Sequence, residues 1–314
     1  EMWLFPKWLP VHPWRYWCHS RMVYLPMAYC YAQRIKAPEN ELILSLREEI
    51  YNEAFDTINW PKQRNKVCGK DAYTIPSPIL KWMNFFTNAY EKILNPWLRK
   101  KAVAYILKYL NAEDAQTDYI NIGPVNKAIN SICIWHAYGK DSVQFKKHVA
   151  RWYDYLWVAE DGMKMSGYNG SQLWDTAFAT RAMLESDLGK LFAETIAKSY
   201  QFIDHSQIAV EHPTHAEFFR HPMIGSWPFS TAENGWPVAD CTAEGLSATI
   251  AVHDSGFVVP LIDEARIKQA IDVILSYQNS DGGWATYELT RAPKWLEKLN
   301  PSEVFADIMI DYSW

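Results

Sequence analysis

Loops that place a glycine beside a tryptophan recur along the chain between stretches of helical periodicity. They lie at residues 170–174, 225–227, 235–236 and 282–284. Turns of one chemistry that recur between amphipathic helices indicate repeated helix pairs, which stack into a solenoid or close into a toroid. The recurrence of these loops between helical segments predicts an all-α fold.

Two segments carry apolar residues at the spacing of an amphipathic helix. The two sets are Val125, Ile129, Ile132 and Cys133, and Ile267, Ile271, Ile274 and Leu275. Asp141 is predicted to cap a helix over 143–156 and Asp263 to cap the second helix, while Gly162 and Gly282 are expected to follow helix ends. Strand-like alternation is scarce, so the chain is predicted to be mainly helical.

Charge and cysteine content argue against several classes of protein. The 31 basic and 36 acidic residues leave no broad positive field, so nucleic acid is not an expected partner. No run of about 18 apolar residues and no signal-peptide pattern is present, so no membrane span is predicted.

The five scattered cysteines form no C-x-x-C pair and indicate free thiols in a reducing compartment. His212 and His215 are interpreted as loop residues rather than metal ligands.

Aromatic residues are unusually frequent, with 16 Trp, 18 Tyr and 13 Phe. They are consistent with a large aromatic core or with rings that line a functional site. The aromatic, weakly charged segment 79–94 is likewise consistent with a buried helix or with a helix in a membrane interface.

Asp240 opens the run D-C-T-A-E at residues 240–244, and residues 241–244 have the spacing of a helix start. From local residues alone, Asp240 is either a helix cap or a functional carboxyl.

The segment 229–246, F-S-T-A-E-N-G-W-P-V-A-D-C-T-A-E-G-L, closely resembles the catalytic segment of the oxidosqualene-type triterpene cyclases. Residues 278–288 contain the Q-x-x-x-G-x-W repeat of that superfamily, in which the amide is expected to stack on the indole and to bond a helix end. Further matches at 17–27, 167–178 and 299–312 extend the resemblance over essentially the whole chain.

The resemblance implies (α/α) barrel, or α-toroid, domains of the terpene cyclase/mutase type that are incomplete at both ends. Residues 1–169 would form part of the N-terminal-half barrel, and residues 170–314 the first part of the catalytic C-terminal-half barrel. Such an enzyme is an isomerase that cyclises (S)-2,3-oxidosqualene without a cofactor or a metal. The chain alone is expected to be inactive, because a second cysteine near the acid in the family lies beyond its end.

By resemblance, Asp240 is the proton donor and Cys241 hydrogen-bonds its carboxyl. Glu244 matches a carboxylate of the proton-resupply network, although a first-turn residue favoured by the helix dipole is an equal interpretation. His19 and Tyr287 match the pair near the final cation, where the imidazole accepts the terminating proton.

By the same resemblance, Trp174 and Phe229 face the migrating positive charge and Trp17 belongs to the aromatic wall. We expect Asp240, Trp174, Phe229, His19 and Tyr287 to line one apolar cavity.

Product choice would depend on the cavity around His19, Tyr168 and Val238. Tyr168 resembles cycloartenol synthases, whereas Val238 resembles the lanosterol type, and Asn234 does not match the His common in the plant enzymes. We expect lanosterol, with cycloartenol or another triterpene as the alternative.

Tyr24 and Ile308 match a constriction between a membrane-facing channel and the cavity. A substrate that enters from lipid implies monotopic attachment to a membrane surface, through a helix such as 79–94. The expected location is the cytosolic face of the endoplasmic reticulum or of a lipid droplet.

Three other classes remain open from the sequence. An inverting glycosidase on a helical toroid would use Asp175 or Glu160 as one of two opposed carboxylates. A protein prenyltransferase subunit would need a zinc site. A non-catalytic helical scaffold would need neither opposed carboxylates nor a zinc site.

Overall fold

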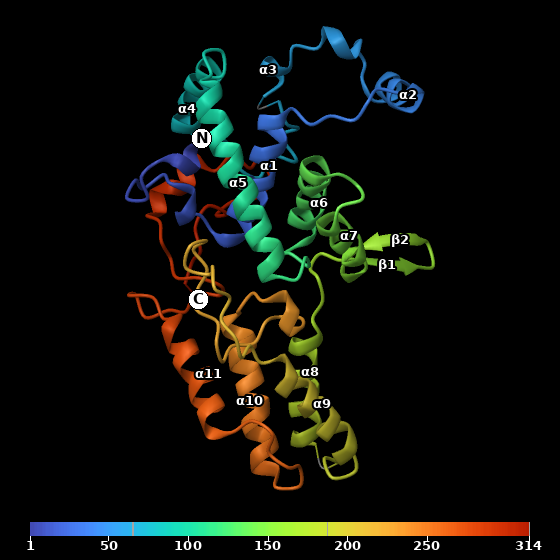
Figure 1. The fold of residues 1–314 in the computed structure, drawn as a ribbon, viewed down its shortest axis with the longest axis vertical. Helices are drawn as coiled ribbons and strands as arrows, with labels where there is room; N and C mark the ends of the chain where they lie inside the picture. The colour runs from blue at the N-terminus through green and yellow to red at the C-terminus, as the bar shows by residue number, and fades with distance from the viewer. Residues whose placement is uncertain (65, 187, 314) are drawn as a thin grey trace.

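The computed structural model describes residues 1–64, 66–186 and 188–313, and they form an all-α fold, as predicted (Figure 1). The helices are α1 (Cys18–Gln33), α2 (Glu41–Ile50), α3 (Trp60–Gln63), α4 (Pro78–Tyr90), α5 (Pro96–Gln116), α6 (Pro124–Tyr138), α7 (Val143–Ala150), α8 (Gln172–Glu185), α9 (Ala193–Ser206), α10 (Ala239–Ser255) and α11 (Glu264–Ser276). Short 3-10 turns stand at Met2–Leu4, Pro13–Arg15, Phe55–Thr57, Trp152–Asp154, Ala232–Asn234 and Lys294–Leu299.

Helix α1 packs against α5 and α6 and contains Pro26 in its interior. Proline has no backbone N–H, so the carbonyl of Met22, four residues earlier, loses its helical partner. The side-chain amide of Asn126 on α6 donates to that carbonyl at 2.9 Å. The carbonyl that Pro26 leaves without a helical partner therefore links α1 to α6.

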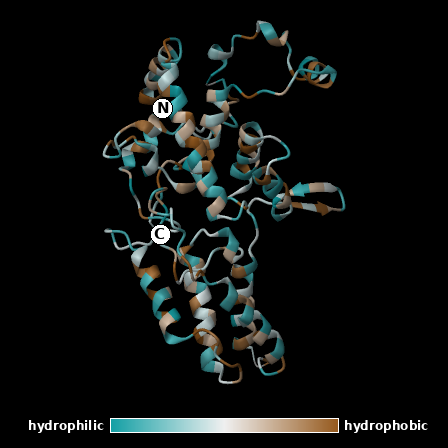
Figure 2. Cartoon of the chain, in the orientation of Figure 1, coloured by the Kyte–Doolittle hydropathy of each residue, from teal (hydrophilic) through white to brown (hydrophobic). Residues whose placement is uncertain are grey.

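Helices α8 to α11 run side by side in the lower part of Figure 1, and α10 contacts the other three. Hydrophobic and hydrophilic residues alternate along these helices, as expected for elements with one buried face (Figure 2). Gly245 lets α10 approach Trp227, because a Cβ at this position would lie 2.8 Å from the indole. The Trp227 indole in turn donates to the Ile203 carbonyl of α9 at 2.8 Å.

The predicted helices over Val125–Cys133 and Ile267–Leu275 are confirmed as α6 and α11. The Asp263 cap is confirmed too, since its Oδ1 accepts from the Arg266 amide at 2.9 Å.

The prediction for 143–156 was wrong in two respects. Ser142, rather than Asp141, caps α7 by accepting from the Phe145 amide at 3.2 Å. The helix ends at Ala150, and the chain forms a hairpin of β1 (Leu156–Ala159) and β2 (Gly162–Met165), in antiparallel register. Gly162 starts β2 instead of following a helix, because the tight turn demands its positive φ of 124°.

The Q-x-x-x-G-x-W segment closes a turn after α11. The Trp284 indole donates to the Ile274 carbonyl at 3.0 Å, and the Gln278 amide donates to the Gly282 carbonyl at 3.1 Å. The indole, rather than the expected glutamine amide, thus satisfies the helix end.

The chain after α11 returns to the N-terminal helices (Figure 1). The Trp17 amide donates to the Met309 carbonyl at 2.8 Å, and the Arg15 guanidinium donates to the Arg291 carbonyl at 2.7 Å. Segments from the two ends of the sequence therefore share one core around the start of α1.

Candidate active site

A row of aromatic rings begins at the start of α1. Trp17 is the N-cap residue and His19 lies in the first turn, with ring centroids 4.5 Å apart. Tyr287, from the segment after α11, meets the His19 ring edge-on at 4.9 Å.

The row continues to the first turn of α8. The hydroxyls of Tyr168 and Tyr287 hydrogen-bond to each other, and the Tyr168 ring lies 5.0 Å from Phe229. Phe229 lies 6.0 Å from Trp174, whose amide also donates to the Phe229 carbonyl at 3.4 Å. Residues from separate parts of the sequence thus form one continuous set of ring contacts, and we call it the aromatic row: Trp17, His19, Tyr287, Tyr168, Phe229 and Trp174.

The aromatic row suits the stabilisation of a cation. Ring faces attract positive charge through their quadrupole and offer no reactive nucleophile. Burial lowers the pKa of His19 to about 4, against the opposing charge of Glu288. The imidazole is therefore neutral near pH 7 and able to accept a proton.

Asp240 lies in the first turn of α10, after the N-cap residue Val238. Asp240 is therefore not the N-cap, and its Oδ1 accepts from the Cys241 amide at 3.0 Å. Partial burial raises the pKa of this carboxyl, the amide hydrogen bond opposes the shift, and the charge of Glu244 adds to it. The group is thus biased towards the protonated form that a proton donor needs.

The surroundings of Asp240 differ from the expected cavity. Asp240 is solvent-exposed and opens onto a pocket of about 300 Å³. The pocket is lined by Ala239, Asp240, Ala243, Ile274, Trp284, Ala285 and Thr286, and by none of the rings of the aromatic row. Successive helical residues point about 100° apart, so Cys241 enters the core while Asp240 faces the pocket.

The Asp240 pocket nevertheless adjoins the row. The Ala239 amide donates to the carbonyl of Thr286, the residue before Tyr287, at 2.9 Å. Burial raises the pKa of Tyr168, and the nearby charge of Asp240 adds to that shift. The first turn of α10 therefore lies against the segment that supplies Tyr287.

Cys241 and Glu244 differ in their relation to Asp240. Cys241 reaches the carboxyl through its backbone amide, whereas the resemblance implied a hydrogen-bonding side chain. Glu244 pairs with Arg181 of α8, at 2.8 Å. The Glu244 carboxylate thus links α8 and α10 one helical turn after Asp240.

Val238 is buried, and its amide donates to the Trp227 carbonyl at 3.2 Å. Ile308 lies beside α1, because its carbonyl accepts from the hydroxyl of Ser20, one turn before Tyr24. Tyr24 and Ile308 are both partly buried, and Tyr24 packs against a separate hydrophobic cluster that includes Tyr16.

A buried charge network beside Tyr287 was not predicted from the sequence. Arg21 binds Glu288 through two hydrogen bonds of 2.6 and 2.5 Å, and Arg291 lies 3.0 Å from the same carboxylate. Burial opposes ionisation of Glu288, but the two arginines outweigh it and lower its pKa. The sequence around Glu288 gave no signal of its pairing with Arg21, because the two residues stand 267 positions apart.

The carboxylates considered for a glycosidase do not face each other across a pocket. Asp175 is exposed at the start of α8 and accepts from Ser171 at 2.6 Å, while Glu160 is exposed in the β1–β2 turn. Among the described residues, no group of three or more His, Cys, Asp or Glu side chains could hold a metal ion.

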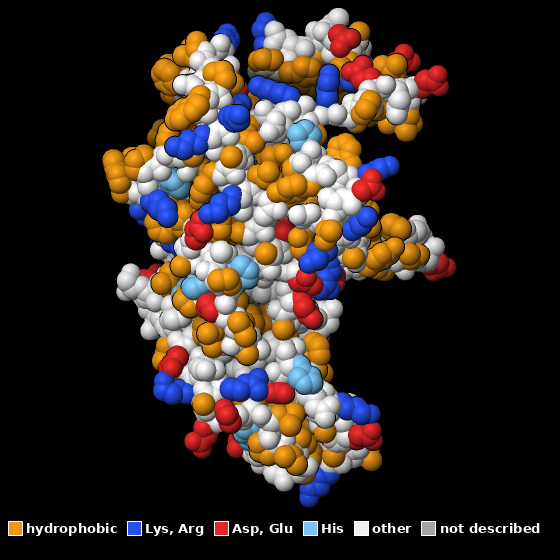
Figure 3. Space-filling model, in the orientation of Figure 1, with side chains coloured by type: hydrophobic (Ala, Val, Ile, Leu, Met, Phe, Trp, Pro, Cys, Tyr) orange, Lys and Arg blue, Asp and Glu red, His pale blue; other side chains and the backbone are white. Residues whose placement is uncertain are grey.

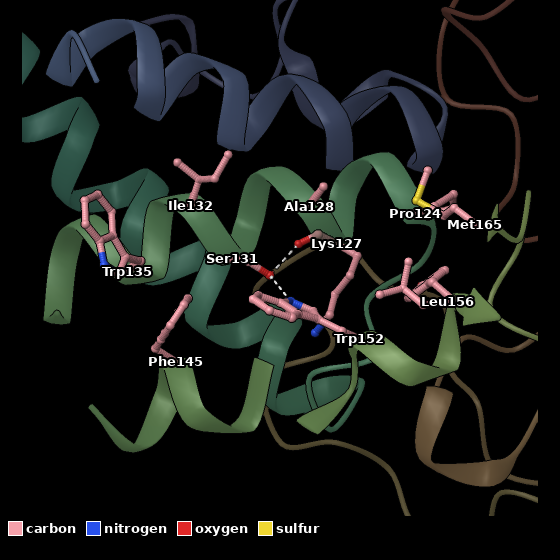
Figure 4. A pocket seen from close by; sticks show the side chains of 11 residues that line it. Pro124, Lys127, Ala128, Ser131, Ile132, Trp135, Phe145, Trp152, Leu156 and Met165 are labelled. Atoms are coloured by element: carbon pink, nitrogen blue, oxygen red, sulfur yellow. Dashed lines mark hydrogen bonds between the residues drawn. The ribbon is translucent and has the colours of Figure 1, made fainter. Parts of the chain in front are cut away.

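A larger pocket, of about 460 Å³, lies between α6, α7 and the hairpin (Figure 4). Trp152 donates to the Ser131 hydroxyl at 3.2 Å, and that hydroxyl donates to the Lys127 carbonyl at 2.8 Å. The Lys127 ammonium is held by the Tyr119 carbonyl at 2.6 Å and by His148 at 3.0 Å. The lining is almost wholly apolar and includes none of the sequence-predicted site residues.

Comparisons with known proteins match the whole length of the chain. Residues 1–160 match the squalene-hopene cyclase N-terminal domain, and residues 170–313 match the squalene-hopene cyclase C-terminal domain. The chain is 49% identical to a cycloartenol synthase of Dictyostelium discoideum, 46% to a lanosterol synthase of Mus musculus and 45% to a lanosterol synthase of Homo sapiens. Each alignment covers 100% of this chain but 44%, 43% and 43% of the respective relative, so the chain spans less than half of their length.

Proposed function

The chain belongs to the squalene-hopene cyclase family, and from this premise we propose that the protein containing it cyclises (S)-2,3-oxidosqualene to a tetracyclic sterol precursor. The observation that carries the proposal is the position of Asp240 beside the aromatic row. Asp240, an acid with a raised pKa, lies in the first turn of α10, and the amide of its neighbour Ala239 donates to the carbonyl of Thr286, the residue before Tyr287 of the aromatic row.

In the first step, the protonated Asp240 carboxyl donates to the epoxide oxygen. The epoxide C–O bond breaks and leaves a tertiary carbocation, which the neighbouring double bonds attack in turn. Asp240 ends the step as a carboxylate, and the exposed side of its pocket gives solvent a path to restore the proton.

During the cascade, the positive charge moves along a hydrocarbon without polar groups. Phe229 and Trp174 supply ring faces at one end of the row, and Tyr168 and Tyr287 extend it towards α1. Each ring-to-cation contact is worth about 0.5 to 2 kcal/mol, depending on desolvation.

The last step removes a proton from the final cation. His19 is proposed as the acceptor, because its low pKa keeps the imidazole unprotonated and the Tyr287 ring fixes it edge-on. Its Nδ1 lies 3.5 Å from the Cys18 sulfur, so that Nε2 is the nitrogen proposed to take the proton.

We propose lanosterol as the product, on the basis of Val238. Its buried side chain precedes Asp240 by two residues and belongs to the same hydrophobic core as Tyr287. Cycloartenol is the second candidate, favoured by Tyr168 and by the 49% identity to the Dictyostelium cycloartenol synthase.

We also propose attachment to one face of a membrane through α4. Ile79, Trp82, Phe85 and Phe86 are all more than half exposed on this helix, and hydrophobic side chains gather over it in Figure 3. No helix of the described residues is long and apolar enough to cross a bilayer. The geometry favours insertion of one helix face, which is consistent with the cytosolic side of the endoplasmic reticulum or of a lipid droplet.

The decisive test is incubation of the natural protein that contains this chain with 2,3-oxidosqualene, followed by mass spectrometry of the products. We expect lanosterol from the wild type and none from Asp240→Asn, which retains the side-chain shape but lacks the acidic proton. Asp175→Asn is the matched control and should remain active. An Asp240→Asn protein that still cyclises the substrate would exclude Asp240 as the donor, and cycloartenol would decide the product in favour of the second candidate.

A further inference from the structure

Two cysteines face each other at the contact between α1 and α6. Cys30 lies in the last turn of α1 and Cys133 lies within α6, with their sulfur atoms 3.5 Å apart. The two residues stand 103 positions apart in the sequence, so the fold brings them together. Both are free thiols, and neither belongs to the aromatic row or to the Asp240 pocket.

The two thiols differ in access. Cys133 is fully buried, and its sulfur also lies 3.5 Å from the Pro26 carbonyl. Cys30, in contrast, is partly exposed to solvent. Cys30 is thus the thiol nearer to solvent, and Cys133 lies in the core.

The thiols also differ in acidity. The hydrogen bond from Cys133 lowers the pKa of Cys30, while the same contact and burial raise the pKa of Cys133. The thiolate is the reactive form of cysteine. Cys30 therefore suits the attacking role, and Cys133 the resolving role.

We propose that Cys30 and Cys133 form an oxidation site that takes hydroperoxides and closes to a disulfide between α1 and α6. In the first step, the Cys30 thiolate attacks the terminal oxygen of ROOH, the O–O bond breaks, and RO⁻ leaves and is protonated to ROH. Cys30 becomes a sulfenic acid.

In the second step, the Cys133 sulfur attacks the Cys30 sulfur. The S–S bond forms, the S–O bond breaks, and the departing hydroxide takes the Cys133 proton to give water. In sum, two thiols and one hydroperoxide give one disulfide, one alcohol and one water, so the two thiols are oxidised and the peroxide is reduced.

The other cysteines of the chain provide internal comparisons. Cys18 and Cys241 are buried, and neither has a cysteine among the contacts that the structure describes. Cys68 is exposed and has no recorded sulfur contact within the described ranges. Oxidation at Cys68 is therefore expected to stop at the sulfenic acid or to link two molecules.

The test treats the protein with hydrogen peroxide at a one-to-one ratio, alkylates the remaining thiols after denaturation, and maps the peptides by mass spectrometry. We expect a Cys30–Cys133 peptide pair lighter by two hydrogen atoms than the sum of the two thiol peptides, and its loss after treatment with dithiothreitol. Of the five cysteines of the chain, two should escape alkylation.

Two matched variants separate the proposal from unspecific oxidation. Cys30→Ser should abolish the linked peptide, and Cys68→Ser should leave its yield unchanged. Full alkylation of both Cys30 and Cys133 at a peroxide dose that oxidises Cys68 would overturn the proposal, as would a stable sulfenic acid at Cys30, trapped by dimedone, without any disulfide. If Cys30→Ser does not fold, the wild-type peptide map alone decides.

Discussion

Arg21 and Glu288 form a doubly hydrogen-bonded ion pair that is buried within the protein and joins α1 to the segment after α11. Arg21 stands two residues after His19, and Glu288 follows Tyr287 directly. The pair therefore fixes the distance between the two ring systems at the start of the aromatic row.

The first prediction concerns Glu288→Gln. The substitution keeps the size of the side chain but leaves the positive charges of Arg21 and Arg291 buried without their carboxylate. Removing one partner of a buried pair costs about 3 to 5 kcal/mol. Denaturant unfolding of the protein should show a loss of this size.

Glu194→Gln is the control for Glu288→Gln, because Glu194 and Lys198 form an exposed pair on α9. Its free energy of unfolding should stay close to that of the wild type, because solvent screens an exposed ion pair. Equal effects of the two substitutions would show that the Arg21–Glu288 pair contributes no more than a surface pair.

The second prediction is a pH dependence that originates at Asp311. This carboxyl is 8% exposed, its Oδ2 has no hydrogen-bond partner among the residues that the structure describes, and burial beside the charge of Glu288 raises its pKa to about 7. A raised folded-state pKa stabilises the protein at pH values below the unfolded pKa of about 4, and this contribution is lost as the pH rises towards 7. The slope is at most about 1.4 kcal/mol per pH unit.

Asp311→Asn removes the titrating group while it keeps a neutral side chain of the same shape. Unfolding midpoints measured from pH 4 to pH 8 should fall with pH in the wild type more steeply than in the variant. Parallel curves would mean that Asp311 ionises at its ordinary pKa.

The sequence predicted the fold class, α6 and α11, because helical periodicity and the Asp263 cap are local properties. The sequence did not predict contacts between residues that are far apart along the chain. The Arg21–Glu288 pair, the bond from Asn126 to the Met22 carbonyl and the Cys30–Cys133 contact each join residues about a hundred or more positions apart. No periodicity records such contacts, since they arise when whole helices pack.

The candidate site was likewise predicted only in part. The resemblance selected the six residues of the aromatic row, and the structure brings their rings into contact. The resemblance did not predict that Asp240 faces a different pocket, because the direction of a side chain depends on where α10 starts. The helix begins at Ala239, two residues earlier than the start at Cys241 that the sequence suggested.

The third prediction tests the aromatic row through Phe229→Leu, which keeps apolar bulk but removes the ring face. A lost cation–π contact of about 1 to 2 kcal/mol corresponds to a roughly 5- to 30-fold lower rate of cyclisation. Initial rates with 2,3-oxidosqualene measure it.

Phe178→Leu is the matched control for Phe229→Leu. Phe178 also contacts Trp174, at 4.8 Å, but it is exposed and lies outside the row. Its rate should stay within about twofold of the wild type, a difference well under 1 kcal/mol. A smaller loss for Phe229→Leu than for Phe178→Leu would argue that Phe229 does not face the cation.

The fourth prediction concerns the exposed rings of α4. Trp82 and Phe86 stack at 6.3 Å on one helix face, as residues one turn apart must. Exchanging both for Ser removes two side chains that are each worth about 1.5 to 3 kcal/mol when they leave water. Partitioning onto neutral phosphatidylcholine vesicles, measured by sedimentation, should therefore weaken at least about tenfold.

Trp157→Ser is the control, because it alters another exposed ring, on the β1 strand, and it should leave partitioning unchanged. If the hairpin substitution lowers vesicle binding and the α4 substitutions do not, the membrane-facing surface lies at the hairpin rather than at α4.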